Sequence, residues 1–95
     1  MKVWLVGTCD VEMTDVQHIC LSEKTALKRW EEIRQTLIKE CQGHIDYLHE
    51  DIHTFTVGGI EMYERMITNL SEIDPKKLDN YPQKEPFISE METEA

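Results

Sequence analysis

Features that would place the protein outside the cytoplasm are scarce in this sequence of 95 residues. The apolar run near the N-terminus, Val3 to Val6, is too short for the core of a signal peptide and for a membrane span. The three cysteines, Cys9, Cys20 and Cys41, are an odd set without CxxC spacing, which excludes the common metal knuckle. Without export their thiols stay reduced, so we expect a cytoplasmic protein.

Positive charge is also scarce. Ten Lys and Arg stand against 19 Asp and Glu, which gives a net charge of −9 at pH 7. The imbalance is uneven, because residues 1–48 carry a net charge of −2 and residues 49–95 carry −7. Such a surface repels nucleic-acid backbones and anionic membranes and attracts basic protein surfaces. We therefore expect a protein partner with a basic surface, and neither direct nucleic-acid binding nor membrane binding.

Catalytic motifs are nearly absent. No serine lies in a GxSxG turn, and no glycine-rich loop is available to hold a phosphate. One pattern, His49-Glu50-Asp51-Ile52-His53, matches HExxH, in which two histidines on a helix bind zinc and the glutamate activates water. The β-branched residues that follow favour a strand, on which the two histidines would lie about 13 Å apart. A metal-dependent hydrolase is therefore the minor alternative, and no catalytic residue, metal ligand or cofactor is assigned.

Two strands and a helix are predicted in the first half of the chain. Residues 2–8 and 16–21 distribute apolar side chains over two faces, and the acidic stretch between them fits a hairpin loop. Ser22 is a good N-cap for a following helix. An apolar stripe at a spacing of three or four residues then indicates an amphipathic helix that packs on the sheet; its members are Leu27, Trp30, Ile33, Leu37 and Cys41. Gly43 either ends this helix or lies within a longer one, since the stripe continues beyond it.

A third strand and a second helix are predicted in the second half. Residues 52–57 are rich in β-branched and aromatic side chains, and two glycines end this segment. Residues 60–70 carry a second apolar stripe, and the acidic residues 82–95 are expected to form a flexible tail. The predicted fold is α+β: a three-stranded antiparallel sheet in the order 2-1-3, with two helices on one face and the element order β-β-α-β-α. Residues 1–81 form its single domain.

Helices on only one face leave the other face of the sheet open. Either Trp4 and Val6 or Val3 and Leu5 lie on that open face, because side chains alternate along the first strand. Exposed apolar side chains in such a position are typical of a docking surface or of a homodimer interface.

The first third of the chain resembles a known group of proteins. The segments KVWLV at residues 2–6 and ICLSEKTAL at residues 19–27, joined by a short acidic hairpin, are similar to the start of small accessory proteins of bacteriophages and mobile elements. Many of those proteins have a second strand that runs into a helix start of the type S-x-E-K-A. The resemblance covers residues 2–30. It implies a compact α+β fold and a non-enzymatic role against or alongside a host protein, and it transfers no site residues.

The functional prediction is a non-enzymatic, acidic protein-binding module, of the kind that phages use as inhibitors or adaptors of host nucleic-acid-handling or defence proteins. Carboxylates spaced like phosphates can occupy a basic cleft, and apolar residues of the tail can dock in a groove. The candidate partner-binding residues are Asp10, Glu12, Asp15, Glu61, Glu64, Phe87, Ile88 and Met91. The alternative is a small-ligand or nucleotide-binding oligomer with clefts between its subunits, with which a local basic patch is compatible; that patch is Lys24, Lys28 and Arg29.

Overall fold

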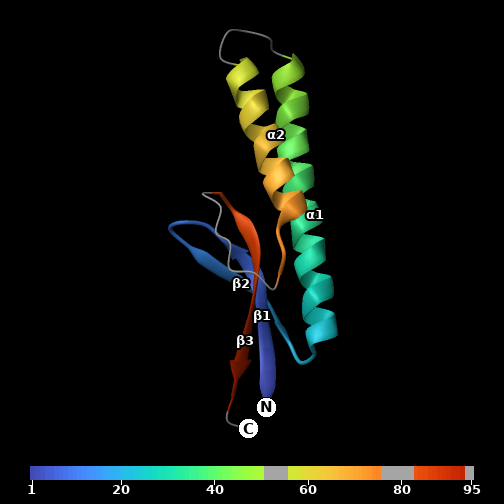
Figure 1. The fold of residues 1–95 in the computed structure, drawn as a ribbon, viewed down its shortest axis with the longest axis vertical. Coiled ribbons are helices and arrows are strands. Elements are labelled where there is room, and N and C mark those ends of the chain that lie inside the picture. Colours follow the sequence, from blue (N-terminus) through green and yellow to red (C-terminus); the bar gives the residue numbers. More distant parts are fainter. Residues whose placement is uncertain (51–55, 76–82, 94–95) are drawn as a thin grey trace.

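A three-stranded sheet and two helices make up the protein, in the order β-β-α-α-β. The computed structural model describes residues 1–50, 56–75 and 83–93. Strands β1 (Lys2–Cys9) and β2 (Thr14–Cys20) form a hairpin, which is followed by helix α1 (Glu23–Glu50), helix α2 (Thr56–Glu72) and strand β3 (Glu85–Glu92). The two helices form a long hairpin whose far part extends beyond the sheet, and the molecule measures 57 × 20 × 20 Å (Figure 1).

The central strand of the sheet is β1. It pairs antiparallel with β2 on one side and with β3 on the other, which confirms the predicted order 2-1-3. Along β2 the register shifts between Val6, which pairs with His18, and Gly7, which pairs with Val16. Gln17 is therefore the extra residue of a β-bulge. The two strands predicted in the first half of the chain are confirmed, although the second begins two residues earlier, at Thr14.

Local signals explain where α1 begins. The hydroxyl of Ser22 accepts a hydrogen bond from the backbone N–H of Thr25 at 3.2 Å, which is the N-cap contact expected from the sequence. The helix then continues through Gly43 to Glu50, so the longer of the two alternatives is confirmed. Its buried stripe consists of Ala26, Trp30, Ile33, Leu37, Cys41 and Ile45. Leu27, which the spacing also predicts in this stripe, is only half-buried.

The strand predicted over residues 52–57 is wrong where the structure describes it. Thr56 and Val57 form the first turn of α2, and residues 51–55 lie outside the described residues. The two glycines predicted to end a strand lie inside the helix, and a Cβ on Gly59 would lie 3.1 Å from the side chain of Leu48 on α1. Close approach of the two helices therefore overrides the β propensity of this segment, because tertiary packing outweighs local preference.

The third strand lies in the segment that was predicted to be a flexible acidic tail. Glu85–Glu92 forms β3, which pairs with β1 from Cys9↔Glu85 to Lys2↔Glu92. Ile88 packs against the core, and the entry to the strand is held by Gln83, whose side chain donates to the carbonyl oxygen of Met66 at 3.1 Å. The segment is rich in glutamate, which is uncommon in strands, so its sequence does not predict one. Pairing with β1 along its whole length selects the strand.

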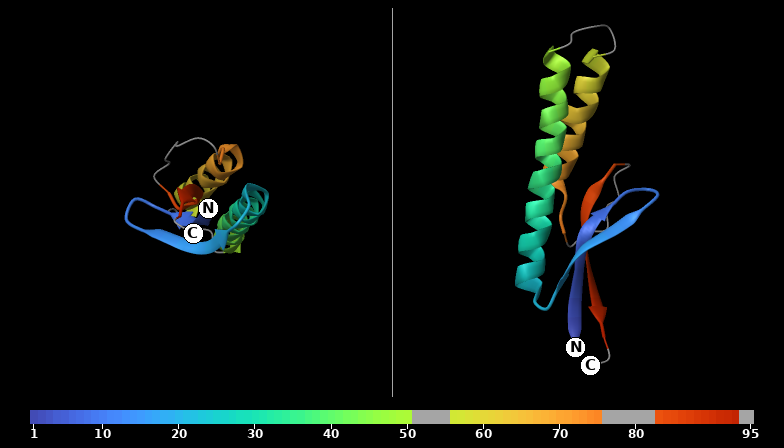
Figure 2. Two further views of the ribbon diagram at one scale, coloured as in Figure 1. Left: turned by 90° about the horizontal axis from the view of Figure 1, so that it is seen from below. Right: turned by 180° about the vertical axis from the view of Figure 1, so that it is seen from behind.

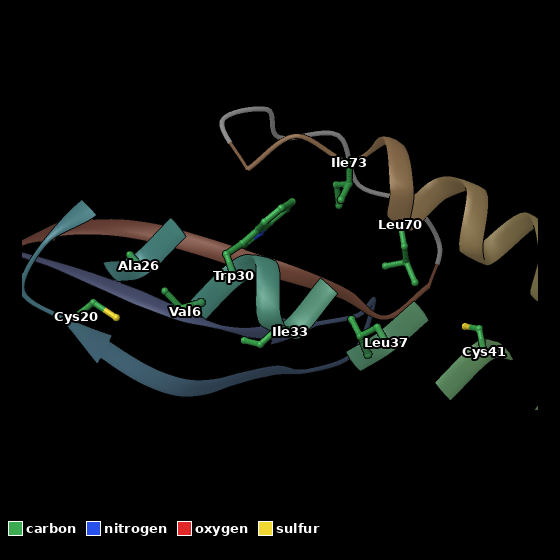
Figure 3. Close-up of a cluster of buried hydrophobic side chains, with 9 residues drawn as sticks. All are labelled: Val6, Cys20, Ala26, Trp30, Ile33, Leu37, Cys41, Leu70 and Ile73. Carbon is green, nitrogen blue, oxygen red and sulfur yellow. The ribbon is translucent and has the colours of Figure 1, made fainter. Parts of the chain in front are cut away.

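The core lies between α1 and one face of the sheet. Val6 and Trp30 are 0% and 2% exposed and meet at its centre, with Cys20 from β2 and Leu70 from α2 on either side (Figure 3). Figure 2 shows that α2 runs along the far part of α1 rather than on the sheet. The prediction of two helices on one face is thus replaced by one helix on the sheet and a second helix packed on the first.

Arg34 ties the end of α2 to this core. Its Nη1 atom donates to the carbonyl oxygens of Ile73 at 3.2 Å and Ser71 at 3.4 Å. Carbonyl oxygens at the C-terminal end of a helix have no donor within the helix, and Arg34 supplies one. The guanidinium lies 4.8 Å from the ring centre of Trp30 and also pairs with Glu31. One side chain therefore joins the C-terminal end of α2 to α1.

Candidate functional site

The uncovered face of the sheet is the most distinctive surface of the described residues. Trp4 and Val6 point toward α1, since Val6 belongs to the core and Trp4 packs against it. Alternation along the strand then places Val3 and Leu5 on the opposite, open face. The register of the pairs adds apolar side chains from both neighbouring strands to that face; they are Val16, Ile19, Phe87 and Met91. Of the two sequence-based alternatives, the open face is therefore the one with Val3 and Leu5.

The edge strands expose most of the apolar surface on this face. Ile19 is 69% and Val16 46% exposed on β2, and Met91 is 47% exposed on β3, whereas Val3 on the central strand is buried and Leu5 is half-buried. The loop between β1 and β2 adds two more exposed apolar side chains at one end of the sheet, because Val11 and Met13 are 82% and 67% exposed. Isolated apolar residues on a surface are ordinary, whereas a continuous group on one face marks a site of interaction.

The candidate residues at the C-terminal end divide between the two faces of the sheet. Phe87 pairs with Gly7 and Met91 with Val3, so both lie on the open face, four positions apart on a strand rather than on a helix. Ile88 pairs with Val6 and packs against the core. Phe87 and Met91 are therefore available on the open face, whereas Ile88 has a structural role.

The acidic candidates do not form one cluster. Asp10 and Glu12 lie in the loop between β1 and β2, at one end of the open face, whereas Asp15 lies on β2 and pairs with Thr8, on the α1 side. Glu61 and Glu64 are exposed on the first half of α2, which projects away from the sheet (Figure 1). Of the acidic candidates, only Asp10 and Glu12 border the open face.

Asp10 organises the hairpin loop. Its carboxylate accepts hydrogen bonds from the backbone N–H groups of Glu12 and Met13, both at 2.8 Å, and its own N–H donates to the carbonyl oxygen of Met13 at 2.9 Å. The bonds from Glu12 and then from Met13 lower the pKa of the Asp10 carboxyl, because they stabilise its charged form. The carboxyl fixes the loop and is at the same time fully exposed to a partner.

We expect the loop to lose this order at low pH. The pKa of Asp10 is lower in the folded state, so its contribution to stability is present above the unfolded pKa and is lost as the pH falls through the folded pKa. The amide NMR shifts of Glu12 and Met13 should titrate together, with a midpoint below the ordinary value for Asp of about 3.9. Asp10→Asn keeps an acceptor and should abolish this titration. A midpoint at or above the ordinary value would contradict the assignment.

Two of the described thiols have pKa values shifted upward, away from reactivity. Burial raises the pKa of the Cys9 thiol, with Glu85 and Asp10 adding to the shift, and burial followed by Glu40 raises that of Cys41. A reactive thiol needs the opposite shift. His44 stacks on Tyr63 with ring centres 4.8 Å apart.

The HExxH pattern falls only partly within the described residues. His49 and Glu50 are exposed at the end of α1, whereas Asp51, Ile52 and His53 lie outside the described residues. In the part of the chain that the structure describes, no three His, Cys, Asp or Glu side chains lie close enough together to hold a metal ion. Neither α1 nor α2 is long and apolar enough, over its described residues, to cross a membrane.

A groove beside the outer edge of β2 has no counterpart in the sequence-based prediction. It encloses about 560 Å³ between the end of β2 and the first turns of α1. Its lining includes His18 and Cys20 from the strand and Thr25 and Arg29 from the helix. The basic patch noted in the sequence was the only local signal for it, since the groove depends on where α1 meets the sheet.

No family model, no curated protein and no solved structure matches this chain. The resemblance of residues 2–30 to phage accessory proteins therefore stays a prediction.

Proposed function

We propose that the protein is a non-enzymatic protein-binding module that acts through the open face of its sheet. The observation that carries the proposal is the group of exposed apolar side chains on that face, where Ile19 is 69% and Met91 47% exposed. A protein that exposes such a surface is stabilised when a partner covers it. The raised thiol pKa values of Cys9 and Cys41 agree with binding rather than covalent chemistry.

The partner is a protein with an apolar contact area bordered by Lys and Arg. Asp10 and Glu12 lie in the loop between β1 and β2, at one end of the open face, so the apolar surface has an acidic rim there. Apolar centres with polar rims are the usual anatomy of protein interfaces. An inhibitor or adaptor of a nucleic-acid-handling or defence protein of a host fits this chemistry, as the resemblance to phage accessory proteins implies. A second copy stacked face to face is the competing occupant.

Two methionines of equal exposure provide a matched test. Met91 on the open face and Met62 on α2 are both 47% exposed. We expect the chain with Met62→Lys to capture the same protein from the native host as the unmodified chain does, and the chain with Met91→Lys to lose it. Circular dichroism checks that both variants are folded. Retention by both variants, or loss by both, would contradict binding through the open face.

Charge should act on the rate of association. Exposed charges are screened beyond a Debye length of about 8 Å at physiological salt, so higher salt should slow association while dissociation changes little. With the captured partner in surface plasmon resonance, Glu12→Lys should slow association more than Glu61→Lys combined with Glu64→Lys, because α2 projects away from the face. An association rate indifferent to salt would leave the acidity as a solubility feature. A larger effect at α2 would move the acidic contact there.

A further inference from the structure

The two edge strands of the sheet, β2 and β3, are protected to different degrees against pairing with a further strand. β3 carries Pro86 and three glutamates, which are the residues that discourage pairing with another strand. β2 carries neither proline nor lysine, and Asp15 is its single carboxylate. Most of β2 is exposed, and in the described sheet no strand pairs with its outer edge. The β2 edge is therefore open to strand addition.

Because of the β-bulge, the side chains of β2 do not alternate regularly between the two faces of the sheet. Cys20 lies on the α1 side because it belongs to the core, and His18 lies there because it pairs with Val6. Gln17 lines a small cavity together with Ile33 and Leu37 of α1, so the extra residue of the bulge points to the same side. Two successive residues of β2, Gln17 and His18, thus face α1.

The face on which each remaining residue of β2 lies follows from its pairing partner on β1. Asp15 pairs with Thr8, which lines the same cavity beneath α1, so Asp15 lies on the α1 side. Four residues of β2 therefore face α1, namely Asp15, Gln17, His18 and Cys20, and Val16 and Ile19 lie on the open face. The order of faces from residue 15 to residue 20 is the same when it is followed in either direction from the midpoint between Gln17 and His18.

A strand with such an order matches a second copy of itself. If two β2 strands pair antiparallel about that midpoint, Val16 of each copy lies opposite Ile19 of the other, and both side chains are on the open face. Asp15 lies opposite Cys20, and both are on the α1 side. Directly opposite side chains in an antiparallel pair have Cβ atoms about 5 Å apart, which allows β-branched side chains to make contact. A regular strand would match a second copy only when the pairing is centred on a residue, so the bulge moves the centre of the match to the point between Gln17 and His18.

The charges along the edge are complementary in the same arrangement. The hairpin end of β2 is acidic, whereas the other end is bordered by the groove that Arg29 lines together with Cys20. The side chain of Arg29 is 43% exposed, and it forms an ion pair with Glu32 at 3.0 Å. Antiparallel pairing brings Asp15 of each copy to the Arg29 groove of the other. A purely basic partner strand would be repelled by Arg29, and a purely acidic one by the hairpin.

We propose that two copies of this chain pair antiparallel through their β2 edges and form one six-stranded sheet. Neighbouring strands lie about 4.8 Å apart, so the two β1 strands are separated by roughly 14 Å. Helices pack at about 8–10 Å, so the two α1 helices fit side by side on one face. The open faces of the two copies become continuous, and they stay free for another protein. The dimer does not depend on the partner proposed above and is measured without it.

Charge reversal tests the pairing. Seven-residue strands bury little area, so we expect a weak dimer, seen by sedimentation equilibrium at about 100 μM and largely dissociated near 1 μM. Asp15→Arg and Arg29→Glu should each weaken dimerisation at least tenfold, since each dimer contains two such contacts. The double variant should restore it. Asp46→Arg, on an exposed acid elsewhere on α1, is the matched control.

Cysteine crosslinking tests the register independently. Val16→Cys and Ile19→Cys lie opposite each other only in the proposed pairing, so an oxidised equimolar mixture of the two variants should form a disulfide-linked dimer. Each variant alone, and the unmodified chain with its native cysteines, should form much less. A protein that stays monomeric at 100 μM would overturn the proposal. So would a dimer that crosslinks equally in the single variants or that does not respond to the charge reversals.

Discussion

A chain that ends at residue 82 should fail to fold cooperatively. The deletion removes β3, which pairs with β1 along its whole length, and leaves a two-stranded hairpin, which is marginal in water. It also removes Ile88 from the core and the contacts of Gln83, whose side chain joins Asn69 and Met66 of α2. We expect near-random dispersion of the amide NMR shifts and no thermal transition in circular dichroism.

Adding the missing strand in trans is the control for this deletion. A synthetic peptide of residues 83–95 should restore amide dispersion in the truncated chain, because the β1 edge and the α2 contacts are available to it. A peptide with the same composition in scrambled order should not. If the truncated chain melted at the temperature of the full chain, residues 83–95 would be the flexible tail that their composition predicts.

Gly7→Ala should be the most damaging single methyl addition in the chain that the structure describes. A Cβ at this position would overlap the carbonyl oxygen of Asp15 and would lie 2.9 Å from its carbonyl carbon and 3.0 Å from the backbone nitrogen of Gln17. These are backbone atoms of the bulge, so the strands have to separate. We expect the free energy of unfolding to fall by about 3 kcal/mol, at the upper end of overpacking effects. The melting temperature would fall by roughly 15 °C in a domain of this size.

Gly43→Ala is the matched control, since the same atom is added in open space. No atom lies within 4 Å of a Cβ at Gly43, which is exposed in the middle of α1. Alanine should stabilise the helix by about 0.5–1 kcal/mol. Chemical denaturation should show a lower free energy of unfolding for Gly7→Ala and a higher one for Gly43→Ala. A neutral Gly7→Ala would mean that the bulge is absent or mobile, and the proposed match between two β2 strands would fail with it.

The parts of the fold that follow from short-range signals are predictable from the sequence. Ser22 marks the start of α1 through a side-chain contact three residues away, and the stripe through Trp30 and Leu37 indicates the buried face. The third strand is not predictable in this way, because β3 is selected by pairing with β1, whose residues lie 76 to 90 positions earlier. Its glutamates indicate disorder, whereas the β-branched residues before Gly58 indicate a strand that the helical hairpin replaces.

The sequence predicts that one face of the sheet is open, but it does not predict which side chains of β1 lie on that face. Both sets of alternate residues on β1 are apolar, so the sequence does not decide whether Val6 or Leu5 faces the helix. The docking of α1 decides it, and Val6 becomes fully buried. The bulge at Gln17 has no signature in the residues around it, except that Gly7 on the neighbouring strand leaves the space that the bulge needs.

The overhanging helical hairpin affects how the protein behaves in solution. A compact chain of this length has a radius of gyration of about 12 Å, whereas the Cα radius here is 15.7 Å. The molecule diffuses as a rod, so it elutes from a gel-filtration column ahead of a spherical standard of equal mass. Elution volume alone would therefore mistake a monomer for a dimer. Rotational diffusion is also faster about the long axis of α1 than across it, and fluorescence anisotropy decay can resolve these two rates.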